Sequence, residues 1–443
     1  MGIHWGIPLL ESLLPEHLRA RWNEAYVDPS MDFTRPENTR MRIYNGLNGE
    51  VLKDIPLPGK LVRVSRRKLR AFLAQEVDVK YDHKLVDIKY DNDGVTAIFA
   101  NGNKAKGTLI VGCDGPKSAV RSLLLGEERA AVTPLDIAHA NTAFCLNDAE
   151  KAKYLRSFHP VWAMCMHPDC FSFWSIQDTV DPDKPETWRF QVCTGWLGER
   201  DKSEDSAAKV AEVKRKGAQL PEPFKSAIQW IPDDYPMTYD QINYWDCIPW
   251  DTHGGRVTLA GDAAHPMPPR RYIALPITAH VKLNFTDRGQ GLNNGIQDVY
   301  NLVSLLTSQT SAFSTPGGTT NGTANGETEA PNAPSPDLAT AIQAYSDEVA
   351  KRGGAEVETS RHNAFMTLDW EKLKESPLFK HALNKMPVAA SNGDANGDAD
   401  GDFKGDAEAG GEAAKQKEVE RAMEGVKMED GHGPEKLKAV IGA

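Results

Sequence analysis

The sequence predicts an α/β protein in which a parallel sheet is combined with a separate β-rich segment. Two short apolar runs, 109–111 and 257–260, each end at a glycine, which is typical of strands buried on both faces of a parallel sheet. Residues 135–250, which lie between them, hold longer runs of extended character. The chain has 443 residues, 40% of them apolar, and this is enough for two or three domains around a large core.

Charge and composition exclude several classes of protein. The net charge is −11, and residues 391–443 hold 13 acidic and 7 basic residues, so the rest of the chain is only mildly acidic. We expect no nucleic-acid partner, since the chain has no basic stripe. No apolar run approaches the ~18 to 20 residues of a membrane span. The first 14 residues lack the basic start and the small-residue cleavage site of a secretory signal.

The cysteines indicate a reducing compartment. The chain has six of them, scattered without a C-x-x-C pair and mostly inside apolar runs. Such cysteines are typical of cytoplasmic proteins, in which thiols stay reduced. We therefore expect a cytoplasmic protein.

The first part of the chain predicts alternating helices and strands. Ser65 is a candidate N-cap, and Leu69 and Phe72 follow it at helical spacing, which predicts a helix from residue 66. Residues 85–99 alternate apolar and polar side chains on either side of an Asp-Asn-Asp-Gly turn, and they predict a hairpin. Another helix is predicted to begin near Ser118.

The middle part predicts strands rich in tryptophan. Residues 161–166, 170–176 and 187–196 are extended in character, and seven of the ten tryptophans lie between residues 162 and 250. One interpretation is that they form the core of a sheet, because tryptophan favours strands. The other is that some of them line a pocket for a flat, apolar substrate.

The last part predicts two helices and two disordered segments. Apolar residues recur on one helical face at 292–306 and again at 338–349. Residues 309–336 are rich in Ser, Thr, Gly, Asn and Pro and predict a disordered loop, and a small, acidic composition from about residue 388 predicts a disordered tail.

One stretch of that tail has the spacing of a calcium loop. Residues 396–401 place oxygen-bearing side chains at alternate positions before a glycine. The twelfth position of the loop is Ala407, where a calcium loop requires a bidentate glutamate. We therefore expect no metal site.

Two glycine-acid turns follow the predicted buried strands. In the first, Asp114 and Gly115 stand between the strand 109–111 and the helix that begins near Ser118. A carboxylate and free backbone amides at the carboxyl end of a parallel strand lie where open α/β sheets bind ligands. A lone Asp-Gly pair is more often only a turn.

The second turn begins at Gly261 and Asp262 and continues at residues 289–298, where several glycines open a helix. Small residues after the strand allow a ligand to approach the backbone closely, and the Asp262 carboxylate can accept hydrogen bonds from a polyol. The start of the helix would stabilise negative charge on a bound ring or phosphate. Taken alone, each piece is more often structural.

Together, the two turns resemble the motifs of the class A flavoprotein monooxygenases, the aromatic-ring hydroxylases related to p-hydroxybenzoate hydroxylase. Residues 64–69 resemble the R-x-x-L helix start of that family, and residues 348–360 resemble its closing helix. The resemblance covers roughly residues 1–385. It implies an FAD-binding, Rossmann-like parallel sheet with a β-rich substrate domain.

The resemblance also implies a division of the chain. We expect a first part of the FAD-binding domain, a β-rich substrate domain, a second part of the FAD-binding domain with its helices, and an acidic tail, at residues 1–134, 135–250, 251–388 and 389–443.

The resemblance assigns roles to residues of both turns. Arg66 would contact FAD on its adenosine and pyrophosphate side. Asp114 and Gly115 belong to the motif associated with both FAD and NAD(P)H. Asp262 would bind the ribityl or pyrophosphate part of FAD, and Pro268 would lie beside the reactive edge of the flavin ring.

The helix that follows would hold the far end of the ring. Gly289, Gly291, Leu292 and Asn293 would place backbone amides at the pyrimidine end, where the helix dipole favours an anionic reduced flavin. In this family the position of His265 belongs to the cofactor motif, so we expect a structural role for it. The resemblance identifies no catalytic residue.

The reaction implied is reduction of FAD by NAD(P)H, activation of O₂, and transfer of one oxygen atom to an aromatic or polyketide-like small molecule. Another flavin-dependent oxidoreductase of the same fold, an epoxidase or a halogenase, shares both motifs. A third reading is a flavin-free, non-catalytic remnant that binds a ligand or a partner.

Two features depart from the family pattern. The chain has no G-x-G-x-x-G, so the first βαβ unit of the fold is expected to be missing. Residues 270–286 interrupt the second turn by 17 residues, a length that suits a retained short intron. The alternative for this insert is a genuine surface loop.

Overall fold

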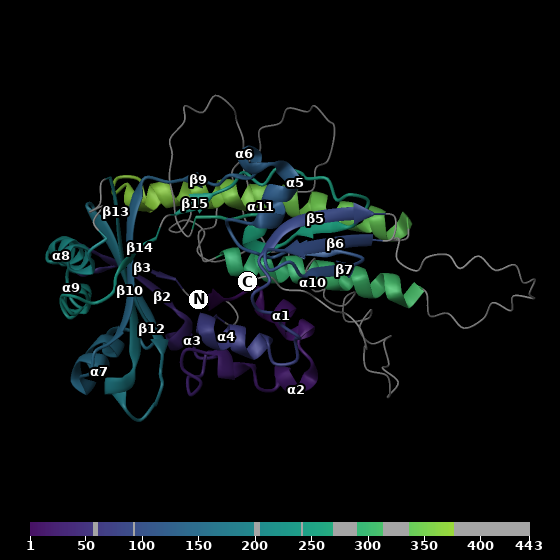
Figure 1. Cartoon of the computed structure of the whole chain (residues 1–443). Helices are drawn as coiled ribbons and strands as arrows, with labels where there is room; N and C mark the ends of the chain where they lie inside the picture. The colour runs from purple at the N-terminus through teal and green to yellow at the C-terminus, as the bar shows by residue number, and fades with distance from the viewer. Residues whose placement is uncertain are drawn as a thin grey trace, which may run out of the picture. The chain divides into compact units, whose positions relative to one another are not determined.

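The structure is a computed structural model that describes residues 1–55, 61–91, 94–198, 204–240, 242–268, 290–312 and 336–375 (Figure 1). All of them belong to one compact unit that spans residues 1–386. The predicted tail, the calcium-like loop at 396–407 and the insert at 270–286 lie outside the described residues.

A seven-stranded sheet forms the β-rich part. Its order is β14 (Thr238–Tyr239), β10 (Ile137–Cys145), β13 (Arg189–Leu197), β12 (Cys170–Asp178), β11 (Trp162–His167), β2 (Met41–Asn45) and β3 (Val51–Ile55). All neighbours pair antiparallel except β11 and β2, which run parallel. The strands predicted at 161–166, 170–176 and 187–196 are confirmed as β11, β12 and β13.

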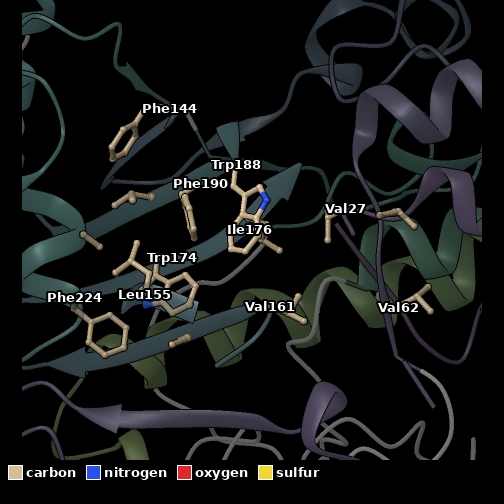
Figure 2. Packing of buried hydrophobic residues seen from close by; sticks show 14 of the residues in the cluster. Val27, Val62, Phe144, Leu155, Val161, Trp174, Ile176, Trp188, Phe190 and Phe224 are labelled. Atoms are coloured by element: carbon tan, nitrogen blue, oxygen red, sulfur yellow. The ribbon is translucent and has the colours of Figure 1, made fainter. Parts of the chain in front are cut away.

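One face of this sheet packs against three helices, α7 (Ala149–Phe158), α8 (Ser206–Gly217) and α9 (Phe224–Gln229). Trp174, Phe190 and Trp196 lie fully buried there, and Figure 2 shows Trp174 and Phe190 among their neighbours. The interpretation of the tryptophans as sheet core is thus confirmed for Trp174 and Trp196. Trp162 is only half-buried, and it packs with Phe173 in a different cluster.

The predicted parallel strands pair with each other. In the described part, β8 (Ile110–Gly112) and β16 (Val257–Leu259) form a two-stranded parallel sheet. A side chain at Gly112 would meet Leu259 and Val120 at 2.7 and 2.8 Å, so a glycine here allows the next helix to pack closely. The prediction of full burial holds for β16 but is wrong for β8. Ile110 and Val111 are half-buried, because β8 pairs with β16 alone among the described strands.

The hairpin predicted at 85–99 is confirmed. β5 (Leu85–Asp91) and β6 (Gly94–Phe99) pair antiparallel, and β7 (Lys104–Gly107) completes a three-stranded sheet. Two short pairs complete the sheets, β1 (Gly2–Ile3) with β4 (Val62–Arg63) and β9 (Thr133–Pro134) with β15 (Asn243–Tyr244).

The predicted helices are confirmed as α4 (Arg66–Leu73), α5 (Ala119–Leu125), α10 (Gln290–Ala312) and α11 (Pro336–Leu368). The backbone amide of Arg121 donates to the Ser118 hydroxyl that caps α5, at 3.0 Å. The loop predicted from residue 309 is wrong for 309–312, which continue α10. Just before this stretch the Ser308 hydroxyl donates to the Leu305 carbonyl at 2.8 Å, a bond within the helix that makes a polar residue compatible with it.

The remaining elements are short. They are the helices α1 (Ile7–Leu13), α2 (Glu16–Arg19), α3 (Pro36–Thr39) and α6 (Glu127–Ala130), and the 3₁₀ turns η1 (Trp22–Ala25), η2 (Pro185–Thr187), η3 (Gly261–Ala263) and η4 (Leu373–Glu375). No described helix is both long and apolar enough to cross a membrane. Among the described residues, no group of three His, Cys, Asp or Glu side chains is placed to hold a metal ion.

His159 joins α7 to β11 and is held in its neutral form. Its Nε2 lies 2.9 Å from the Arg40 carbonyl, and its Nδ1 accepts from the amides of Val161 and Trp162 at 3.1 and 3.2 Å. The residue is only 3% exposed. Burial lowers the pKa of His159 to about 4, so the folded protein resists protonation that the unfolded chain accepts near its ordinary value of about 6.5.

We therefore predict that acid weakens the fold through His159. Between about pH 6.5 and pH 4 the unfolded chain binds more protons, so the free energy of unfolding should fall as the pH is lowered. The free energy of unfolding should be lower at pH 5.0 than at pH 7.5 by about 2 kcal/mol because of His159, and urea unfolding at the two pH values measures this difference. His159→Gln should be less stable at pH 7.5 but should lose less on acidification. Equal losses in both proteins would contradict the assignment.

Candidate functional site

The two glycine-acid turns lie at the same edge of the structure. They follow β8 and β16, which are parallel neighbours, and the Ala260 amide donates to the Gly112 carbonyl at 2.9 Å. The carboxyl ends of both strands therefore meet, as the sequence predicted, in the position where open α/β sheets bind ligands.

Arg121 fastens the two turns to each other. Its side chain is buried, and it donates from Nη2 to the Pro116 carbonyl at 2.5 Å and from Nη1 to the Ala263 carbonyl at 2.8 Å. Nε donates to the Ala130 carbonyl at 3.0 Å, and the guanidinium lies 4.7 Å from the ring centre of Trp245. Both turns depend on this one side chain for their separation.

Asp114 supports the start of α5 together with its N-cap Ser118. Its carboxylate accepts from the Ser118 hydroxyl at 2.5 Å and from the amides of Ala119 and Val120 at 2.6 and 3.2 Å. Because the carboxylate is engaged with the helix, the part of this turn that remains to contact a ligand is its backbone. Gly115 has a φ of +84°, a conformation that favours glycine, and no described atom lies within 4 Å of the position a Cβ would take.

Asp262 lies beside the first turn of α10. A Cβ built on Gly291 would be 3.5 Å from its Oδ1, so the glycine brings the helix close to the carboxylate. The surrounding protein keeps water from part of this group and raises the pKa of Asp262, while the positive charges of His265 and Arg66 act in the opposite direction. Arg66, the first residue of α4, is thus brought near Asp262 from a distant part of the sequence.

The start of α10 is tied to the first residues of the chain. The Asn293 side chain is buried, and its Oδ1 accepts from the amides of His4 and Gly6 at 3.1 and 3.2 Å. Trp5 Nε1 donates to Gln290 Oε1 at 2.7 Å. A Cβ on Gly6 would meet Asn293 Oδ1 at 2.9 Å, so a glycine is needed here. These contacts leave the first amides of α10 oriented toward the turn at Asp262.

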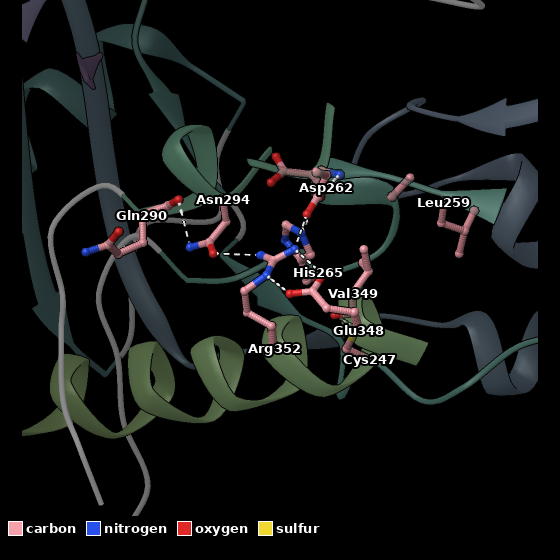
Figure 3. Close-up of polar contacts among 12 residues, drawn as sticks. Cys247, Leu259, Asp262, His265, Gln290, Asn294, Glu348, Val349 and Arg352 are labelled. Atoms are coloured by element: carbon pink, nitrogen blue, oxygen red, sulfur yellow. Dashed lines mark hydrogen bonds and ion pairs between the residues drawn. The ribbon is translucent and has the colours of Figure 1, made fainter. Parts of the chain in front are cut away.

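A cluster of charged residues around Asp298 fixes the position of α10 relative to the turn at Gly261 (Figure 3). Asp298 on α10 is fully buried, and its Oδ2 accepts from the Gly261 amide and pairs with His265 Nε2, both at 2.7 Å. Its Oδ1 pairs with Arg352 of α11 at 2.5 Å. Arg352 also bonds Asn294 at 2.9 Å.

Charge and hydrogen bonding keep Asp298 ionised. Burial by itself would raise the pKa of Asp298, but His265, Arg352 and the Gly261 amide together lower it. Glu348 approaches Arg352 to 2.6 Å at helical i, i+4 spacing and supplies the second negative charge of the cluster. The cluster therefore joins α10, α11 and the turn at Gly261 through ion pairs that centre on the buried Asp298 carboxylate.

The structure brings most of the predicted site residues to one place. Gly291, Leu292 and Asn293 form the first turn of α10, and Pro268 is buried in the turn that leads toward it. Arg66, Asp114, Gly115 and Asp262 were placed above. Gly289 lies outside the described residues.

Sequence reasoning missed three residues that hold the site, namely Arg121, Asp298 and Arg352. A signal for two of them was present. Asn294 and Asp298 stand four residues apart on a helix that is otherwise apolar on one face, as do Glu348 and Arg352.

Comparison with known proteins identifies relatives of this chain. Residues 68–272 match the family model of an FAD binding domain. The chain is 37% identical over 391 residues to the FAD-dependent monooxygenase phnB of Penicillium herquei, covering 87% of this chain and 85% of that protein. It is 32% identical to the FAD-dependent monooxygenase cctM of Talaromyces islandicus, covering 87% of this chain and 86% of the relative.

A solved structure shares the fold. The substrate complex of a salicylate hydroxylase superposes with a TM-score of 0.58 at 17% identity, with 85% of each chain covered. The expected fold class, an FAD-binding α/β fold of the p-hydroxybenzoate hydroxylase type with a β-rich part, is confirmed. The division into domains at residues 134, 250 and 388 and the missing first βαβ unit stay predictions.

We predict that the buried Asp298 carboxylate contributes far more to stability than a more exposed carboxylate that also pairs with arginine. Asp298→Asn leaves Arg352 buried beside a neutral amide, and breaking a buried ion pair from one side costs about 3–5 kcal/mol. Asp54 also pairs with two arginines, Arg40 and Arg42, at 2.8 and 3.4 Å, but on the surface. Asp54→Asn should therefore cost no more than about 1 kcal/mol in urea unfolding. Equal costs would contradict this account.

Proposed function

This chain belongs to the family of FAD-dependent monooxygenases, and from that premise we propose that it uses NAD(P)H and O₂ to hydroxylate an aromatic or polyketide-like small molecule. The observation that carries the proposal is that the turns at Gly115 and Asp262 follow neighbouring parallel strands and that Asp262 lies against the first turn of α10. Three sets of backbone amides and one carboxylate then face the same space.

The residues present fit FAD on two observations. Gly115 and Gly261 both have positive φ, and at neither position does any described atom lie within 4 Å of a built Cβ. The backbone is therefore bare where a large flat ligand would approach it. Bound FAD supplies the redox chemistry, since it accepts a hydride from NAD(P)H and activates O₂ so that one oxygen atom reaches the substrate and the other leaves as water.

The protein supplies position and electrostatics. Under this proposal the amides of Gly291, Leu292 and Asn293 face the pyrimidine end of the ring, and the dipole of α10 lowers the energy of negative charge there. Asn293 holds that turn through its side chain and leaves its backbone amide to the cofactor.

The remaining contacts surround the rest of the cofactor. Asp262 accepts hydrogen bonds from the ribityl hydroxyls, and the positive charge of Arg66 balances the pyrophosphate. The backbone of Asp114 and Gly115 serves the motif shared with NAD(P)H, while Pro268 excludes water beside the reactive edge of the ring. His265 stays structural, with Nε2 committed to Asp298.

The substrate class and the location complete the proposal. An aromatic substrate is supported by Trp162 and Phe173, which stay half-buried on the side of the seven-stranded sheet that α7, α8 and α9 do not cover. A cytoplasmic location is supported by the six cysteines, all of which are free thiols. An epoxidase or a halogenase would use the same cofactor site, and the fate of the oxygen atom distinguishes these reactions.

We predict that Gly291→Ala separates cofactor binding from folding. The added Cβ would lie 3.5 Å from Asp262 Oδ1 and 3.8 Å from Met267, which are ordinary contacts, and alanine stabilises a helix relative to glycine by about 0.5–1 kcal/mol. The apoprotein should be at least as stable as the wild type. The FAD dissociation constant, measured by flavin absorbance after equilibrium dialysis, should rise by about tenfold, since the methyl group takes the space of the ring.

Gly295→Ala is the matched control, because it makes the same change one turn further along α10, 3.6 Å from the Gly261 backbone. It should leave FAD affinity at the wild-type value. Unchanged affinity in Gly291→Ala would show that the cofactor does not lie against the first turn.

We also predict oxygen transfer from O₂. The FAD-loaded chain, given NADPH or NADH and a panel of hydroxynaphthalenes and hydroxyanthraquinones under ¹⁸O₂, should form a product that carries one ¹⁸O atom, as mass spectrometry can detect. Reduced-cofactor oxidation should accelerate with the same compounds. A product that carries halide, or hydrogen peroxide with no oxygenated product from any compound, would reject the proposed hydroxylation.

A further inference from the structure

Arg63 occupies an unusual position against the seven-stranded sheet. It lies in β4, and its Nη2 donates to the Ser175 hydroxyl of β12 at 2.6 Å and to Gln191 Oε1 of β13 at 3.1 Å. Its guanidinium is 5.3 Å from the ring centre of Phe173. Ser175 and Phe173 alternate with the buried Trp174, so Arg63 contacts the side of the sheet that α7, α8 and α9 do not cover.

This cation has no negative partner in the described part of the chain. Its hydrogen bonds go to a hydroxyl, an amide oxygen and, at 3.4 Å, the Ile176 carbonyl, and Nη1 makes none with any described residue. Burial lowers the pKa of Arg63 to about 10. Arg63 is half-buried, and since a partly desolvated guanidinium is stabilised by a hydrogen-bonded anion, its Nη1 edge is suited to receive one.

The polar neighbours of Arg63 hold it in one orientation. Gln191 Nε2 donates to Asn141 Oδ1 at 3.0 Å, and Asn141 Nδ2 donates to Asp240 at 3.1 Å. With its amide nitrogen committed in this way, Gln191 presents its oxygen to Arg63. Asp240 is the carboxylate at the other end of this chain of side chains, separated from Arg63 by two neutral amides, so the positive charge remains uncompensated.

Arg63 also lies near the proposed cofactor site. Arg63 in β4 pairs with Gly2 in β1, and the Gly2 carbonyl accepts from Asn293 Nδ2 at 3.4 Å. Asn293 belongs to the first turn of α10, to which we assigned the pyrimidine end of the flavin. Arg63 thus stands between that turn and the aromatic side of the sheet, where Trp162 and Phe173 pack together at 5.7 Å between ring centres.

We propose that Arg63 binds an ionised oxygen of the substrate, so that the chain selects aromatic molecules that carry a carboxylate or an acidic phenol. The inference rests on the proposed function, because it places the substrate between the flavin and this side of the sheet. The aromatic rings contact the body of the molecule, and the guanidinium binds its anionic group bidentately.

The test measures binding, without turnover. Equilibrium dialysis of the FAD-loaded chain at pH 7.5 compares three probes: 1-hydroxy-2-naphthoate, which carries a carboxylate; 2,4-dinitro-1-naphthol, which is ionised only at its phenol; and 1-naphthol, which is neutral. The wild type should bind at least one of the two anions roughly 10- to 100-fold more tightly than 1-naphthol, as expected for a charged hydrogen bond. Comparison of the two anions identifies the group that is recognised.

Two variants of the site should abolish this preference. Arg63→Met removes the cation. Gln191→Glu keeps Arg63 but places a carboxylate at the position 3.1 Å from it, and it carries the test if Arg63→Met fails to fold. Both should reduce the preference for the anion to about onefold with little change for 1-naphthol. Arg42→Met is the matched control, since Arg42 lies in the same sheet and is already paired with Asp54; it should keep the wild-type preference.

Two results would overturn the inference. One is a wild-type protein that binds both anions no more tightly than 1-naphthol, and the other is an Arg63→Met protein that folds and keeps the preference. Failure of the proposed function is read separately, from the flavin spectrum before dialysis and from oxygen transfer. A chain that takes up FAD and oxygenates neutral phenols without preferring anions would reject the role of Arg63 alone.

Discussion

The carboxylate of Asp298 joins three segments of the chain: α10, to which it belongs, the turn at residues 261–265, and α11. Its two oxygens bind the backbone of Gly261, the ring of His265 and the guanidinium of Arg352, all within 2.7 Å. Gly261 and His265 belong to the turn that follows β16, and Arg352 belongs to α11. The position of the first turn of α10 relative to Asp262 is therefore a consequence of one buried charge, and Arg121 adds the turn at Gly115 to the same unit.

This organisation explains why polar residues are buried at a site whose chemistry belongs to a cofactor. Buried ion pairs contribute little to net stability compared with apolar packing, but they tolerate few alternative arrangements. If Asp298 moved away from Arg352, the buried carboxylate would lose its guanidinium partner, and Arg352 would keep only the more exposed Glu348. An apolar contact between α10 and α11 would allow sliding, whereas the ion pairs fix the register of the two helices and with it the amides that face the cofactor.

Features that depend on neighbours in sequence could be predicted, and features that depend on distant partners could not. The hairpin 85–99, the helix from residue 66 and the strands 110–112 and 257–259 follow from local spacing, although the Ser65 side chain makes no capping hydrogen bond to that helix. The convergence of Asp114 and Asp262 could be predicted because parallel strands place their carboxyl ends together. In contrast, nothing local indicates that β2 pairs with β11, since a strand's partner is set by burial of its faces. The end of α10 was misplaced because composition alone does not show that Ser308 bonds within its helix.

Three arginines show how the partners of a side chain can distinguish a structural role from a role in ligand binding. Arg121 bonds only to backbone carbonyls, and its donors are spread over Pro116, Ala130 and Ala263, so its environment is complete without a ligand. Arg352 is complete because Asp298 and Glu348 match its charge. Arg63 differs from both. Its hydrogen-bond partners are neutral, and its Nη1 has no acceptor among the described residues. The sequence alone does not distinguish these three arginines, whereas their hydrogen-bond and charge partners do. The physical distinction is the unmatched charge, which a structural role leaves unexplained and an anionic ligand would satisfy.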